Sequence, residues 1–200
     1  MKQPRRIVLV FSALVTMGSL VACGTTTQPS ESTTPAVVTA SVEQVSTQHN
    51  DADTMFAQMM IVHHEGAIDM ADLALTKADR DEVKALAERI SAAQGPEIEQ
   101  MSAWLETWGE PTDAGGHAGH GGMDMNGMTQ EEVMGQLEGL SGAEFDDSFL
   151  KAMIAHHEGA VEMSERQLVD GENPEALALA ETIIADQKEE IAEMQGLLEG

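Results

Sequence analysis

Residues 63–70 read His-His-Glu-Gly-Ala-Ile-Asp-Met, and residues 156–163 read His-His-Glu-Gly-Ala-Val-Glu-Met, 93 positions further along the chain. Around these blocks, 10 of the 18 positions in residues 53–70 are identical to their counterparts in residues 146–163. This agreement is well above chance. It indicates that the chain contains two similar halves that arose by duplication.

Both copies lie in segments with the period of an α-helix. In the first half, one helix face is marked by side chains at steps of three and four residues. These positions are Phe56, Met60, His63, Ala67, Ala71 and Ala74. Asp51 or Asp53 can cap the start of this helix. A second helix is expected from about Arg80 to Trp108, and Pro96 inside it predicts a kink or a break near Gly95.

The second half repeats this pattern, and Asn173-Pro174 opens its last helix at a position that favours proline. A short additional helix is expected at about residues 129–137. Two helical hairpins with matching apolar stripes should pack as an all-α four-helix bundle, with a pseudo-two-fold axis between them. Repeat 1 then spans about residues 51–108, and repeat 2 spans about residues 144–200.

The chain opens with a basic stretch and continues with an apolar run from Ile7 to Val15. This order is typical of a secretory signal, which we place at residues 1–22. The run is short for a membrane-spanning helix, although an uncleaved membrane anchor is the alternative.

Cys23 is the only cysteine, and it follows Leu20-Val21-Ala22. This setting resembles the lipobox of bacterial lipoproteins, in which the cysteine becomes the lipidated N-terminus. Residues 23–50 are then a lipidated, flexible tether, because they are rich in Thr, Ser, Pro and Gln. The domain that follows, residues 51–200, would be extracytoplasmic and anchored by lipid to a bacterial membrane.

The chain is strongly acidic, with a formal net charge of −25 at pH 7. Such a charge disfavours nucleic acid and anionic lipid surfaces as partners, and it attracts cations. A solvated, soluble surface explains most of these charges without any specific partner.

The duplicated block offers imidazole and thioether ligands on one helix face. Because side chains three and four residues apart are neighbours, Met60 lies beside His63 and His64, and Met70 follows two turns later. The second half offers its counterparts, and one further methionine of each half could complete a site across the hairpin. These residues are His156, His157, Met153, Met163, Met101 and Met194. Thioethers prefer Cu(I) and imidazoles accept both oxidation states of copper, so the mixture favours copper. The alternative is that the methionines fill gaps in the core and the histidines are hydrogen-bonded core residues.

The segment between the repeats, residues 109–128, is rich in Gly, His and Met and is expected to be a mobile loop. Its candidate ligands are His117, His120, Met123, Met125 and Met128. The segment has almost no bulky side chains, so it cannot build a core. A His/Met tract of this kind suits capture of copper from dilute solution, and a low-complexity linker is the alternative.

Four polar residues of the second and fourth helices are candidates for supporting the histidines by hydrogen bonds to their other ring nitrogen. They are Gln94, Glu97, Gln187 and Glu190. The alternative is that these residues form a water-exposed edge of each apolar stripe.

Gly66 and Gly159 stand inside helices at a cost of roughly 1 kcal/mol each relative to alanine. These glycines could be tolerated without any role. Because both halves retain them, we favour the interpretation that they let another helix or a metal ion come close to the histidines.

The blocks at residues 60–67 and 153–160 resemble the bacterial family called domain of unknown function 305, and the resemblance extends from about Asp51 to Gly200. It implies a ferritin-like four-helix bundle exported from the cytoplasm, in a family that includes CopM-like copper-binding proteins. It also implies the block histidines and methionines as ligands. Ferritin-like di-iron bundles use Glu-x-x-His. Here Met60 and Met153 stand at the place of that glutamate, which disfavours iron and favours copper.

The sequence therefore predicts an exported, membrane-anchored copper-binding protein for copper sequestration, tolerance or transfer, without catalysis. Its partners would be copper ions, the membrane and a copper transporter or oxidase. One alternative is a ferritin-like di-metal oxidase with Glu97 and Glu190 as bridging carboxylates. The other is a non-catalytic interaction module at the cell surface with vestigial histidines.

Overall fold

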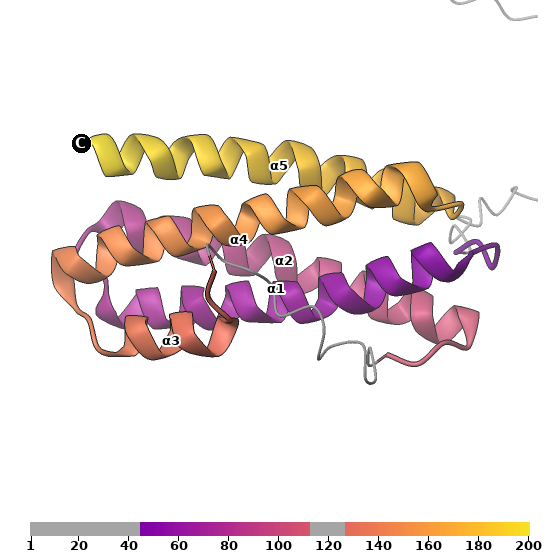
Figure 1. Cartoon of the computed structure of the whole chain (residues 1–200), viewed down its shortest axis with the longest axis horizontal. Helices are drawn as coiled ribbons and strands as arrows, with labels where there is room; N and C mark the ends of the chain where they lie inside the picture. Colours follow the sequence, from indigo (N-terminus) through magenta and orange to yellow (C-terminus); the bar gives the residue numbers. More distant parts are fainter. Residues whose placement is uncertain (1–44, 113–126) are drawn as a thin grey trace, which may run out of the picture. The chain divides into compact units, whose positions relative to one another are not determined.

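A computed structural model describes residues 45–112 and 127–200, which form five helices and no strand (Figure 1). The helices are α1 (Asp51–Lys77), α2 (Asp81–Trp108), α3 (Gln130–Glu138), α4 (Gly142–Asp170) and α5 (Pro174–Glu199). The four long helices confirm the expected all-α, ferritin-like bundle of two repeated hairpins, and α3 is the expected short helix. Within the described residues, no helix is both long enough and apolar enough to cross a membrane.

The two hairpins meet through their first helices. The helix pair α1 and α2 forms one hairpin, α4 and α5 form the other, and α1 packs against α4. The start of α1 contacts the end of α4, where Asn50 Nδ2 donates to Asp170 O at 2.9 Å. The end of α1 reaches the start of α4, where Asp79 N donates to Asp146 Oδ1 at 3.0 Å. Helices α1 and α4 are therefore antiparallel, as Figure 1 shows, and α3 lies against both.

The start of α1 differs from the expectation. Asn50, and neither Asp51 nor Asp53, is the N-cap, because its side chain accepts hydrogen bonds from the backbone of Ala52 and Asp53. Asp53 completes a capping box by accepting from Asn50 N at 2.9 Å. In α2 the helix continues through Pro96, so proline does not break it there. It ends at Gly109, whose φ of 75° is the left-handed conformation that favours glycine.

The interior contains two apolar clusters. The Trp104 cluster is built from Phe56, Ala57, Met60, Ile61, Met101, Trp104, Leu105, Ala160, Ala176, Leu179, Ala180 and Ile183. The Phe149 cluster includes Met70, Leu86, Ile90, Leu137, Phe145, Phe149, Leu150, Met153 and Met194. On each long helix, buried polar residues stand between the residues of one cluster and those of the other. These residues are His63, His64, Gln94, His156, His157 and Gln187, and we call them the histidine layer.

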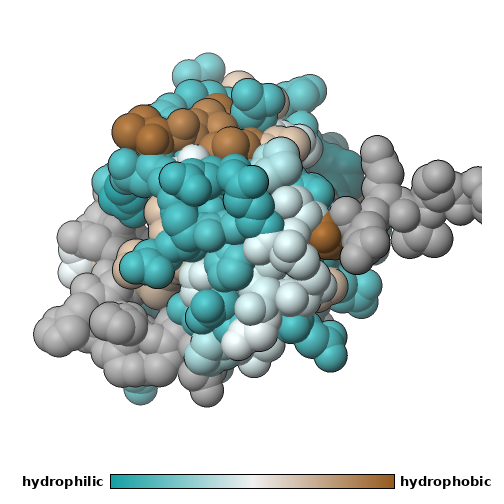
Figure 2. Space-filling view, turned by 90° about the vertical axis from the view of Figure 1, so that its right-hand side faces the viewer, coloured by the Kyte–Doolittle hydropathy of each residue, from teal (hydrophilic) through white to brown (hydrophobic). Residues whose placement is uncertain are grey.

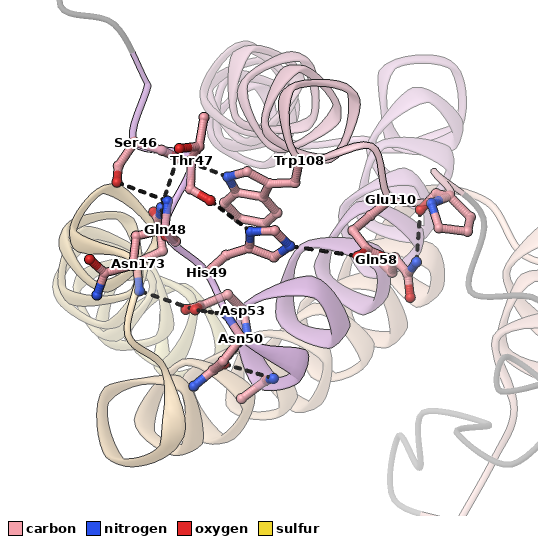
Figure 3. Close-up of polar contacts among 12 residues, drawn as sticks. Ser46, Thr47, Gln48, His49, Asn50, Asp53, Gln58, Trp108, Glu110 and Asn173 are labelled. Carbon is pink, nitrogen blue, oxygen red and sulfur yellow. Dashed lines mark hydrogen bonds and ion pairs between the residues drawn. The ribbon is translucent and has the colours of Figure 1, made fainter.

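Residues 45–50 lie across one end of the bundle, ahead of α1 (Figure 3). Trp108 Nε1 donates to Ser46 O at 2.9 Å, and Asn173 Nδ2 donates to Gln48 O at 2.9 Å. The ring of His49 stacks on Trp108 with centroids 4.6 Å apart. The last residues of the segment expected to be tether thus pack on the bundle, whereas the signal, Cys23 and residues 24–44 lie outside the described residues.

Candidate metal centre

His63 and His156 meet at the contact between the two hairpins. His63 comes from α1 and His156 from α4, and their ring centroids are 3.6 Å apart with an angle of 43° between the planes. Each residue is only 2% exposed. They occupy equivalent positions of the repeat, so the pseudo-two-fold axis passes between the two rings. The packing of the hairpins therefore brings together two imidazoles that lie 93 residues apart in the sequence.

Most of the nitrogens of this pair have no hydrogen-bond partner. Among the described residues, neither Nδ1 nor Nε2 of His63 is bonded, and Nδ1 of His156 is also free of partners. A buried polar group without a partner typically costs about 1–3 kcal/mol, so proteins rarely keep one. Two imidazoles that share an ion need nitrogens within about 4 Å of each other, since metal–nitrogen distances are about 2.0–2.1 Å. The ring centroids are 3.6 Å apart, so the two imidazoles are in direct contact.

Both rings are held in the neutral form. Burial lowers the pKa of His63 well below its usual value, and the neighbouring His156, His64 and His157 lower it further. Burial likewise lowers the pKa of His156 to about 3, with smaller contributions from His157 and His64. A neutral imidazole keeps the nitrogen lone pair that binds a metal ion, so the pair is ready for a cation without losing a proton.

The second histidine of each block is bound by a glutamate of the same hairpin. His64 Nε2 lies 2.7 Å from Glu97 Oε2, and His157 Nε2 lies 2.7 Å from Glu190 Oε2. Both imidazoles are fully buried, whereas the carboxylates are 18% and 20% exposed. A carboxylate at Nε2 selects the tautomer that leaves the Nδ1 lone pair free, and Nδ1 of both rings has no partner among the described residues. Carboxylates orient metal-bound histidines in the same way.

The two glutamines of the histidine layer are buried, at 3% and 4% exposure for Gln94 and Gln187. The alternative that they form a water-exposed edge is therefore wrong. Gln94 makes no hydrogen bond to a described residue through either amide atom, and Gln187 Oε1 has no partner either. The expected hydrogen bond from Gln94 to an imidazole is thus not formed. Gln94 precedes Glu97 by one helical turn, so its unpartnered amide adds to the free polar atoms near His64.

The methionines of each helix do not form the single patch that we expected, because they are divided between the two apolar clusters. Met60 and Met101 are fully buried in the Trp104 cluster, and the partly buried Met163 of the other hairpin packs against it. The Phe149 cluster holds their counterparts Met153, Met194 and Met70, all fully buried. We call these two sets the methionine trios. Each trio draws one methionine from the opposite hairpin, and one trio lies on either side of the histidine layer.

Among the described residues, no three or more His, Cys, Asp or Glu side chains are grouped so that they could hold a metal ion. A metal ion bound by the imidazole pair would therefore have no third His, Cys, Asp or Glu ligand from the described residues. Any further ligand would be of another kind, such as a thioether. Of the loop candidates, His117, His120, Met123 and Met125 lie outside the described residues. Met128 is described, and Gln136 Nε2 lies 3.1 Å from its sulfur.

The glycines of the blocks both make room beside the layer, but for different groups. A Cβ on Gly159 would lie 3.2 Å from His63 Nε2, so this glycine permits the close approach of the imidazole. A Cβ on Gly66 would instead meet the side chain of Gln130 at 3.0 Å. Gln130 was not among the residues predicted for the site. It lies in α3, outside the repeated hairpins, so the repeat offered no signal for it.

The fold and the site define a class of all-helical, duplicated bundles with a buried histidine pair between the two halves. Residues 53–198 match the family described as Domain of unknown function (DUF305), and the chain belongs to this family. None of the curated proteins matches the chain.

Several solved structures are similar to the chain in fold and sequence. A DUF305 fragment from Deinococcus radiodurans is 34% identical with a TM-score of 0.65, covering 74% of this chain and 96% of its own. A candidate secreted DUF305 protein from Streptomyces coelicolor is 31% identical with a TM-score of 0.64, covering 74% and 91%. CopM in its Cu(II)-bound form is 35% identical with a TM-score of 0.61, covering 74% and 95%. CopM has also been solved with Cu(I) and with silver.

Proposed function

We propose that the chain is an exported copper-binding protein, anchored to a bacterial membrane through lipidated Cys23, that sequesters copper, supports copper tolerance or passes copper on. The observation that carries this proposal is the pair of neutral, buried imidazoles at the meeting of the two hairpins. The histidine layer contains four imidazoles, and at least one nitrogen of each has no partner among the described residues. So many unsatisfied nitrogens are costly for stability alone, and a cation bound by His63 and His156 would satisfy those of the pair.

The donor set supports copper over harder metals. Imidazole accepts both oxidation states of copper, and the methionine trios offer thioethers, which prefer Cu(I), on either side of the layer. The relative CopM has been solved with Cu(I), Cu(II) and silver, which fits a site with soft ligands. By contrast, Glu97 and Glu190 each bind a different histidine, so the described residues lend no support to a di-metal centre bridged by carboxylates.

The surface supports the collection of cations. The chain carries 35 acidic and 10 basic residues. Figure 2 shows hydrophilic surface over much of the end of the bundle that includes the α4–α5 turn, with an apolar patch along its upper edge. A field of this sign raises the local concentration of positive ions. The partners of the proposed function are copper ions, the membrane and a copper transporter or oxidase that receives the metal.

The test is a titration of the protein with Cu(I) and with Cu(II) against a competing chelator. The parent for all variants carries His117→Ala and His120→Ala, so that binding by the loop histidines does not contribute. We expect binding tighter than micromolar in this parent. In the double variant His63→Leu/His156→Leu, the affinity should fall at least about tenfold, a loss of about 1.4 kcal/mol or more.

The matched control is His49→Leu, which removes an imidazole from the end of the bundle and leaves the histidine layer intact. We expect this variant to bind copper like the parent. Binding weaker than micromolar in the parent, or equal affinities in the double variant and the control, would contradict the proposal.

A further inference from the structure

The first residue of α3 places its side chain on α1. Gln130 Nε2 donates a hydrogen bond of 2.8 Å to the backbone oxygen of Gly66. A Cβ on Gly66 would lie 3.0 Å from both Cδ and Nε2 of Gln130, which is closer than ordinary van der Waals contact. The absence of a side chain at Gly66 therefore makes room for the amide of Gln130.

Gly66 adjoins the histidine layer. It follows His63 by three residues, so the two positions are neighbours on α1. Its counterpart Gly159 faces the layer directly, because a Cβ there would meet only His63 among the described atoms within 4 Å. Gly66 and Gly159 are equivalent positions of the repeat. At Gly66, however, the side chain of Gln130, from outside the four long helices, fills the space, so α3 packs on α1 one helical turn from His63.

The helix that provides this cover is held by few contacts. It has nine residues, and only Val133 and Leu137 are buried. A helix of this length is unstable in water by itself, so its order depends on packing. Lys77 Nζ binds the carbonyl oxygens of Glu138 and Leu140 and thereby fixes the far end of the helix. Gln130 fixes the near end, and its Oε1 is buried with no partner among the described residues.

Beside α3 lies a groove of about 210 Å³ that is partly open to solvent and is lined by residues of α3 and α4, including Val133, Leu137, Ala152 and Ala155. The contact between α1 and α4, which brings His63 to His156, does not involve α3. The near end of α3 could therefore move away from α1 while the contact between α1 and α4 stays in place. Figure 1 shows α3 lying along one side of the bundle.

We propose that α3 covers an entrance to the histidine layer beside Gly66, and that the amide of Gln130 holds this entrance closed. The inference rests on the proposed function in one respect, since it assigns to α3 the control of how fast a metal ion enters and leaves. Gln130 is then a positioning residue. It binds α1 rather than the ion, and its loss changes rates without changing the number of ions bound.

The first test needs no metal. Diethyl pyrocarbonate modifies imidazoles that it can reach, and mass spectrometry of peptides measures the rate at His63 and His156. The variant Gln130→Ala removes the hydrogen bond. The variant Gly66→Ala displaces the amide by steric contact and does not weaken α1, because alanine favours a helix more than glycine does. Loss of one such hydrogen bond should raise the labelling rate about 2- to 10-fold in either variant.

The matched control is Gly95→Ala in α2, where a new Cβ meets no described atom within 4 Å. It makes the same chemical change in a helix without touching α3, so its labelling rate should equal that of the natural chain. The midpoint of urea unfolding is measured for all variants to show that faster labelling comes from local opening. Labelling rates in Gln130→Ala and Gly66→Ala equal to that of the control would overturn the proposal.

The second test measures the release of copper from the loaded protein into an excess of chelator. Gln130→Ala and Gly66→Ala should release copper faster by a similar factor, with an unchanged number of ions bound. Unchanged release rates in a protein that binds copper would overturn the role of α3 in metal exchange. Faster labelling in a protein that binds no copper would instead support the entrance while the proposed function fails.

Discussion

Asp53 and Asp146 occupy equivalent positions in the two hairpins, and each accepts hydrogen bonds from the backbone of the opposite hairpin's turn. Asp53 accepts from the N–H groups of Glu172 and Asn173 at 3.1 Å. Asp146 accepts from those of Asp79 and Arg80 at 3.0 Å. Both aspartates are fully buried. The two reciprocal contacts fix the antiparallel register of α1 and α4, and that register brings His63 against His156.

The first prediction concerns this reciprocal contact. Asp53→Ala leaves the N–H groups of Glu172 and Asn173 in the α4–α5 turn without their acceptor, so the free energy of unfolding should fall by about 2–4 kcal/mol. Urea unfolding followed by circular dichroism measures the change. Asp69→Ala replaces an exposed aspartate of α1 and should change stability by no more than about 0.5 kcal/mol. Equal effects of the two substitutions would show that the buried contact does not hold the hairpins.

A second prediction follows from the unsatisfied imidazoles. The double variant His63→Leu/His156→Leu removes buried nitrogens that have no partners and replaces them with apolar groups of similar size. We therefore expect the metal-free protein to become more stable by about 1–2 kcal/mol, as judged by urea unfolding. His64→Leu should do the opposite, because it breaks the hydrogen bond to Glu97 and leaves that carboxylate partly buried. A loss of stability in the double variant would mean that the imidazoles contribute to the core.

A third prediction concerns the pH dependence of stability without metal. The pKa of His63 and that of His156 are lowered by burial, the latter to about 3. Below pH 6.5 the unfolded chain binds protons at these histidines and the folded chain does not, so stability falls as the pH falls. Between pH 7 and pH 5 this loss amounts to at most about 2 kcal/mol for each histidine.

The check is urea unfolding of the natural chain and of His63→Leu/His156→Leu at both pH values. The carboxylates contribute equally to both proteins, so the difference between the two slopes isolates the histidine pair. We expect a flatter dependence in the variant, by up to about 4 kcal/mol over this range. Parallel curves would show that the two rings bind protons as readily in the folded protein as in the unfolded chain.

The sequence predicts the helices well and the site less well, for physical reasons. The duplicated block and the helical period depend on local spacing, and so the two hairpins could be derived from them. The expected single patch that contains both Met60 and Met70 is not formed, because ten residues of helix span about 15 Å. The neighbours of these methionines depend on the register between α1 and α4. That register is set by Asp53 and Asp146 through contacts between residues more than 60 positions apart, which a single sequence does not reveal.

The last prediction tests whether the methionine trios bind soft metals. The triple variant Met60→Leu/Met101→Leu/Met163→Leu keeps the volume of the Trp104 cluster and should cost less than about 1.5 kcal/mol of stability for each substitution. Because thioethers prefer Cu(I) and comparable soft ions, we expect weaker binding of Ag(I) and Cu(I), by at least about tenfold, with little change for Cu(II). Competition titrations measure all three. Met55→Leu alters an exposed methionine of α1 outside the trios and serves as the control. If the triple variant binds silver as the control does, the methionines of this cluster only pack, and soft-metal binding has to be sought at the histidines.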